Sequence, residues 1–241
     1  MSGHSHFATI KHKKAATDAK RSKIFSKISR LITIAVKEKG DSNIETNSKL
    51  KLAIEQAKEA NMPSDNIERA IKKGTGDMEG EKLEEVAFEA YGPGGTAVIM
   101  EGITDNKNRT LGEIKQILSQ YGGKLVAEGA VKWMFERKGI IVIETTNLPE
   151  NKDTAELKVI ESGAEDLSWK EDSLEVTTKP EDLEQVKKNL ENNNITASSA
   201  FLGWVPKDEV SLDEKDAESN QKLFEALDDN DAIQDIFSNL K

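Results

Sequence analysis

Lysine and arginine residues crowd the first forty positions of this 241-residue chain. Ten of them stand there against two acids, so the segment carries +8, whereas the whole chain carries −10 and the other 201 residues carry −18. Cations spaced along a tail and a helix can neutralise successive phosphates and release counterions. The pattern predicts binding to a nucleic-acid backbone through Lys11, His12, Lys13, Lys14, Lys20, Arg21, Lys23, Lys27 and Arg30. The alternative is that these cations serve solubility or pair with the acidic remainder of the chain.

Two further basic segments are candidates for phosphate contact. Lys107 and Arg109 stand in "TDNKNRT", just before an expected helix, where free backbone N–H groups and the helix dipole favour anions. The alternative is that the Asp and Asn residues of this segment only form Asx-turns. The end of the third expected helix supplies additional cations, which are Arg69, Lys72 and Lys73.

The segment "YGPGG" joins two strand-like runs and is typical of a hairpin. It matches neither a Walker loop nor a dinucleotide-binding fingerprint. As a turn it needs no further explanation, although a glycine-rich tip also permits close backbone approach to a partner. The residues of this possible contact loop are Gly92, Pro93, Gly94 and Gly95.

Groups that could support catalysis are scarce. The chain has no cysteine. Its three histidines, His4, His6 and His12, all stand in the tail that precedes the first expected helix, which we call the basic arm. A pair such as His4 and His6 is a weak metal-binding pattern without cysteine or a nearby acid cluster. The acidic run "DDNDAIQD" lacks the spacing of an EF-hand loop. We therefore expect no enzyme activity, no metal, no cofactor and no small-molecule substrate.

The hydrophobic period predicts three short helices in residues 1–77. On the first helix, Ile24, Ile28 and Ile32 share one face, and the cations lie on a neighbouring stripe. The second helix should end before Pro63. This part of the chain shows no strand pattern, so we expect a basic helical domain.

Residues 138–205 alternate as strand, helix, strand, strand, helix, strand, which is the ferredoxin-like βαββαβ order. Residues 82–137 give two strands, a helix opened by a capping box at Thr110 and Glu113, and a strand over "AVKWMFE". The tail, 206–241, adds one helix and one strand that cannot bury their apolar faces alone. We therefore predict an α+β multidomain protein in which the ferredoxin-like domain is inserted into a discontinuous α+β domain with a mostly antiparallel sheet.

Four long segments resemble the YebC family of probable transcriptional regulatory proteins, whose mitochondrial relatives are translational activators of cytochrome c oxidase subunit I. They are "GHSHFATIKHKKAATDAKRSKIFSKISR", "NMPSDNIERAIKKGTG", "EAYGPGGTAVIMEGITDNKNRT" and "GGKLVAEGAVKWMFERKG". The resemblance implies three domains, a cytoplasmic location and no catalytic residues. One departure is that His6 and Phe7 stand where the family usually has Lys and Trp, which weakens any contact made by that tip.

Two functions follow as hypotheses. The first is a DNA-binding regulator of transcription that uses the basic N-terminal domain. The second, which the resemblance also implies, is a ribosome-associated factor that binds ribosomal RNA and relieves stalling, for example at proline runs. No apolar run is long enough to span a membrane. No heptad run or large apolar helix face is left over, so we expect a monomer.

Overall fold

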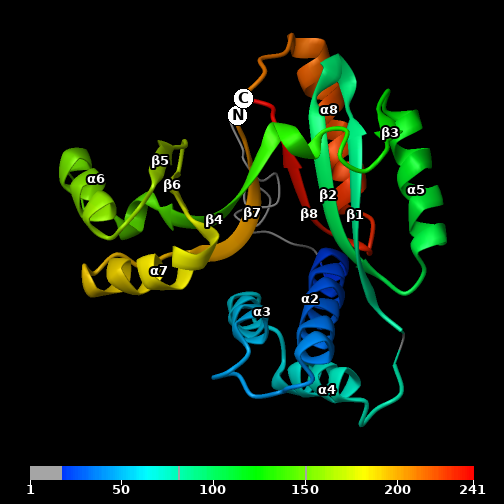
Figure 1. Ribbon diagram of the computed structural model, residues 1–241, viewed down its shortest axis with the longest axis horizontal. Helices are drawn as coiled ribbons and strands as arrows, with labels where there is room; N and C mark the ends of the chain where they lie inside the picture. Colours follow the sequence, from blue (N-terminus) through cyan, green and yellow to red (C-terminus); the bar gives the residue numbers. More distant parts are fainter. Residues whose placement is uncertain (1–17, 81, 150) are drawn as a thin grey trace.

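The computed structural model describes residues 18–80, 82–149 and 151–241, with side chains from Arg21 onward. Its first part is a bundle of three helices, α2 (Asp18–Lys39), α3 (Ser48–Glu59) and α4 (Ser64–Thr75). Apolar residues at three- and four-residue spacing face one another in its core. Among them, Ile32, Val36, Leu50 and Ala57 are fully buried. This bundle is the predicted helical domain (Figure 1).

The first sheet is antiparallel and has the strand order β3-β1-β2-β8. Its strands are β1 (Glu84–Tyr91), β2 (Ala97–Thr104), β3 (Lys124–Val126) and β8 (Ile233–Ser238). The helices α5 (Lys107–Gln120) and α8 (Glu214–Asp228) cover one face, as Figure 1 shows. Because β8 pairs with β2, the C-terminal helix and strand complete a sheet that begins 150 residues earlier. We call this unit, with both its segments, the middle domain.

The second sheet is antiparallel with the order β5-β6-β4-β7. Its strands are β4 (Phe135–Glu144), β5 (Asp166–Trp169), β6 (Ser173–Thr178) and β7 (Ser199–Pro206). Two crossover helices, α6 (Lys152–Glu161) and α7 (Leu183–Asn192), pack on one face of it. The predicted α+β fold class, with a ferredoxin-like unit inserted between the segments of another unit, is confirmed.

Two local predictions in the middle domain were wrong. Helix α5 begins at Lys107, three residues before the expected capping box, because the Asn106 side chain accepts a hydrogen bond from the Arg109 N–H and caps it. The expected strand over 130–136 is instead the one-turn helix η2 (Lys132–Met134), and the third strand pairs earlier, as β3. The cause is Glu89 of β1, whose carboxylate accepts hydrogen bonds from the backbone N–H groups of Val131 and Lys132 in this segment and of Gly129 just before it.

The two sheets meet in an apolar cluster at the face of the first sheet that its helices leave open. Ile99 and Phe237 come from the first sheet, and Phe201 and Trp204 come from β7. Trp204 donates its indole N–H to Glu101 at 2.8 Å, and Arg137 binds the same carboxylate at 2.9 and 3.0 Å. The Glu101 carboxylate, which binds one guanidinium nitrogen of Arg137 and the Trp204 indole, therefore fixes β4 and β7 against β2. No helix of the described residues is long and apolar enough to cross a membrane.

Glu175 of β6 is only 5% exposed, and burial raises its pKa to about 7. The folded protein therefore holds this proton more tightly than the unfolded chain, so the stability it contributes is full below about pH 4.5 and falls as the pH rises through 7. The variant Glu175→Gln has an amide in place of this carboxyl group, and the amide does not ionise in this pH range. Urea denaturation gives the free energy of unfolding of the variant and of the parent at each pH. We expect the difference between them, variant minus parent, to be about 2 kcal/mol larger at pH 8 than at pH 5. Glu171→Gln, at an exposed turn, is the control, and an equal gain in both variants would contradict the assignment.

Candidate nucleic-acid interface

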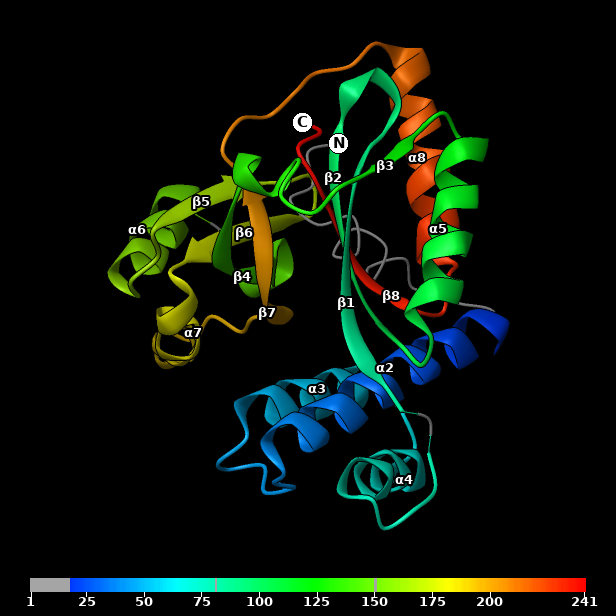
Figure 2. The ribbon, with the colours of Figure 1, turned by 45° about the vertical axis from the view of Figure 1, so that its right-hand side comes forward.

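The cationic stripe on α2 lies against the acidic turn between α8 and β8. Lys23 binds the Asp229 carboxylate at 2.8 Å, and Lys27 binds the Asp228 carboxylate at 2.8 Å and its carbonyl oxygen at 2.7 Å. Arg30 donates to the carbonyl oxygens of Asp231 at 2.9 Å and Ile103 at 3.3 Å. Figure 2 shows α2 running from the helical bundle to this end of the middle domain. The stripe is therefore an interdomain contact.

This placement changes the predicted role of three residues. Lys27 is 5% exposed, so it cannot also meet a phosphate without leaving its partner. Asp229 raises the pKa of Lys23 by accepting its hydrogen bond, so that cation too is directed toward the protein. Lys23 and Lys27 follow the alternative of pairing with the acidic remainder, and Arg30 donates to the backbone carbonyl oxygens of Asp231 and Ile103. Arg21 is exposed on the same helix, whereas Lys11, His12, Lys13, Lys14 and the Lys20 side chain lie outside the described residues.

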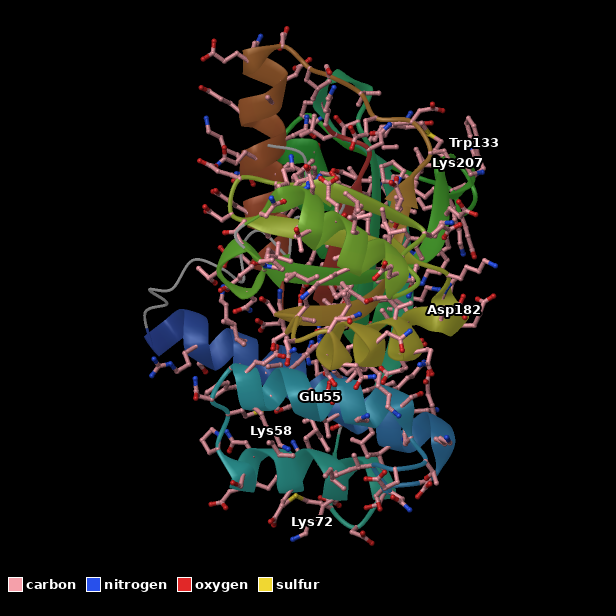
Figure 3. All side chains as sticks on the ribbon, turned by 90° about the vertical axis from the view of Figure 1, so that its left-hand side faces the viewer. Glu55, Lys58, Lys72, Trp133, Asp182 and Lys207 are labelled. Atoms are coloured by element: carbon pink, nitrogen blue, oxygen red, sulfur yellow. The ribbon has the colours of Figure 1, made fainter. Side chains whose placement is uncertain are left out.

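The cations of α4 have a different environment. Arg69, Lys72 and Lys73 are all exposed on this helix, and Lys58 of α3 is exposed as well. Arg69 hydrogen-bonds the Asn66 side chain. No carboxylate in the described part of the chain forms an ion pair with any of the four. Figure 3 labels two of them, Lys58 between α3 and α4 and Lys72 beyond α4. We call Lys58, Arg69, Lys72 and Lys73 the α4 patch.

The segment before α5 is mostly occupied by local contacts. Arg109 binds the Asp105 carboxylate, which lowers the pKa of Asp105, and it also lies 3.7 Å from Glu113. The Asn106 cap takes the Arg109 N–H that an anion would need. Lys107 is exposed as well, and it lies at the rim of a hollow of about 190 Å³ that Lys132 and Trp204 also line.

The glycine-rich tip is η1 (Pro93–Gly95), and it is fixed to the N-terminal part of α8. Asn220 donates to the Pro93 carbonyl at 2.9 Å, and Gly92 is buried beside this side chain. Gly94 and Gly95 are exposed and have φ angles of +66° and +80°, which favour glycine. In the predicted contact loop, Gly94 and Gly95 are therefore exposed, Pro93 is half-buried and Gly92 is buried.

One exposed aromatic residue was missed by the sequence analysis. Trp133 of η2 is 67% exposed, whereas the neighbouring Val131 and Phe135 are buried. Burial alone would raise the pKa of Glu89, but hydrogen bonds from Gly129, Val131 and Lys132 lower it, so this carboxylate is held charged beneath the turn. The sequence analysis interpreted residues 130–136 as a strand, and that interpretation gave no sign that the Trp133 indole projects from the surface.

The described residues contain no cluster of three or more His, Asp or Glu side chains that could hold a metal ion. What they do show is a class of protein: a basic helical bundle joined to two antiparallel α+β units, one inserted in the other, with charged surface patches in place of a deep polar cleft. The comparison with known proteins agrees with this class.

The chain belongs to the TACO1/YebC family. Residues 5–77 match the model of the TACO1/YebC protein N-terminal domain, and residues 83–240 match the model of the TACO1/YebC second and third domain. A probable transcriptional regulatory protein of Halothermothrix orenii is 47% identical over 240 residues, covering 99% of this chain and 94% of the relative. Another, from Caldanaerobacter subterraneus subsp. tengcongensis, is 48% identical over 241 residues, covering 100% and 98%.

The fold is also shared with a solved structure. The crystal structure of a conserved hypothetical protein from Aquifex aeolicus superposes with a TM-score of 0.90 at 45% identity, covering 98% of this chain and 97% of that one.

The contact of Lys27 with Asp228 can be tested against that of Lys23 with Asp229. The side chains of the first pair are 6% and 23% exposed, and those of the second are 43% and 70% exposed. We expect Lys27→Ala to lower the free energy of unfolding by about 1–3 kcal/mol, because it leaves a partly buried carboxylate without its cation. Lys23→Ala should cost under about 1 kcal/mol, as exposed pairs do. Urea denaturation measures both, and equal losses would contradict the interdomain role of Lys27.

Proposed function

We propose that this protein is a nucleic-acid-binding regulator of gene expression, without enzyme activity, that acts on DNA in the cytoplasm as a monomer. The α4 patch carries the proposal, because it comprises four exposed cations with which no described carboxylate forms an ion pair. Cations that stay free on the protein can take the place of the counterions of a phosphate backbone. The names of the relatives, probable transcriptional regulatory proteins, support the regulatory role.

The mode of binding follows from the charge distribution. The chain as a whole carries −10, so a duplex is attracted only when the basic end faces it. Exposed lysine and arginine side chains contact phosphates without reading bases. The affinity and the orientation of binding therefore come, in this proposal, from the α4 patch and from Lys11, Lys13 and Lys14 of the basic arm. Neither the patch nor the arm recognises bases.

The triple variant Arg69→Glu, Lys72→Glu, Lys73→Glu tests the patch. We expect its affinity for a DNA duplex to fall roughly tenfold or more at low ionic strength, and the slope of log K against log salt to become shallower by about 3. Fluorescence anisotropy of a labelled duplex across a salt series gives both quantities. The control is Lys179→Glu, Lys188→Glu, Lys222→Glu, which makes the same charge change at exposed positions of the other two domains. Equal weakening in both variants would reject the α4 patch as the contact.

Ribosomal RNA is the second candidate target. One observation favours it: the exposed cations lie in separate places, at the α4 patch and at Lys107, since the continuous stripe on α2 is occupied by the protein itself. Scattered cations suit a folded RNA better than a straight duplex.

Sedimentation of the parent chain and of the α4 triple variant through a sucrose gradient, from cell lysate at physiological salt, separates the two targets. If the parent travels with ribosomal subunits and the variant stays at the top, the RNA target is correct. If both stay at the top, DNA remains the proposed target.

A further inference from the structure

Trp133 is the most exposed of the large apolar side chains in the described residues, at 67%. An indole in water forgoes the burial that stabilises most tryptophans, so an ordered turn that presents one is an unusual use of this residue. Figure 3 shows Trp133 projecting at one edge of the molecule beside Lys207, far from Lys58 and Lys72 of the α4 patch.

The turn that carries Trp133 is held rigidly. The buried Glu89 carboxylate accepts hydrogen bonds from the N–H groups of Gly129, Val131 and Lys132 at 2.6, 2.7 and 2.9 Å. The Trp133 indole donates its own N–H to the Ala130 carbonyl at 2.9 Å. With its polar atom satisfied inside the turn, the side chain offers a partner only its flat apolar surface, already fixed in position.

One lysine belongs to the turn that carries this indole, and another binds the turn. Lys207, which follows β7, donates to the Trp133 carbonyl at 2.9 Å, and Lys132 reaches over the Trp204 ring at 5.0 Å. Exposed acids, Glu128 and Asp208, stand in the same two segments. A long run of phosphates would meet these acids, whereas a single phosphate beside the lysines would not. The charges therefore suit one nucleotide better than an extended backbone.

We propose that Trp133 is a stacking platform for one unpaired nucleobase, with Lys207 and Lys132 placed to contact the adjoining phosphate. Stacking on an aromatic side chain accepts any base, because every base has a π-face. A protein partner is less well matched, since the core of a protein interface is depleted of charge and the exposed neighbours of Trp133 are charged. The inference rests on the proposed binding of nucleic acid but names a site distinct from the α4 patch.

The test compares a single-stranded RNA decamer with an abasic strand of the same length, by fluorescence anisotropy at one fixed salt concentration. We expect Trp133→Ala to weaken binding of the base-bearing strand by roughly five- to a hundredfold and to leave the abasic strand unaffected. Trp133→Phe keeps an aromatic face and should retain most of the affinity. Lys207→Gln should weaken both strands, because it removes a charge and no stacking surface. Thermal unfolding of each variant verifies that it folds.

The outcomes separate the site from the wider proposal. If the parent binds both strands equally and Trp133→Ala changes neither, the stacking site is wrong while nucleic-acid binding stands, and a protein partner at Trp133 would give this same result. If the parent binds neither RNA nor the DNA duplex at low salt, both proposals fail. If the α4 triple variant loses duplex binding yet keeps the preference for the base-bearing strand, the two sites are independent, as proposed.

Discussion

The position of the helical bundle on the middle domain depends on the cations of α2 at the C-terminal end of α8. The last carbonyl groups of a helix have no partner within it, and the helix dipole makes that end negative. Lys27 binds the Asp228 carbonyl and carboxylate there, and Lys23 and Arg30 bind beside it. Three positive side chains thus satisfy an acidic helix end that would otherwise face water or repel its neighbours. This contact fixes the helical bundle to the middle domain.

A second contact joins the bundle to the inserted domain. Lys187 of α7 binds Glu55 of α3 at 2.7 Å, so in this contact the bundle supplies the carboxylate and the inserted domain supplies the ammonium group. With one side of the bundle occupied by α8 and another by α7, the cations of α4 remain as its exposed basic surface. The domain contacts that occupy the α2 stripe therefore leave α4 as the basic surface of the bundle on which the proposed phosphate contact rests.

Much of this fold could be predicted from the sequence, because it is set by local periodicity. The 3.6-residue spacing of Ile28 and Ile32 defines α2, and the strand and helix alternation in 138–205 defines the ferredoxin-like unit. The partner of Lys27 could not be predicted, since Asp228 lies 201 residues away and no local rule links them. A basic stripe on a helix shows only that its charge must be compensated. It does not distinguish a phosphate from the protein's own acids.

The segment around Trp133 shows the same limit in a different way. Its apolar residues Val131, Trp133 and Phe135 recur at two-residue spacing, as in a strand, and Val131 and Phe135 are indeed buried. What prevents the strand is Glu89, about forty residues earlier, which takes three of the N–H groups that a ladder would use. A buried carboxylate that removes backbone donors from a sheet turns a regular element into a rigid turn. The turn then exposes a side chain that the strand would have placed against a neighbour, so a long-range contact creates the surface on which the stacking proposal rests.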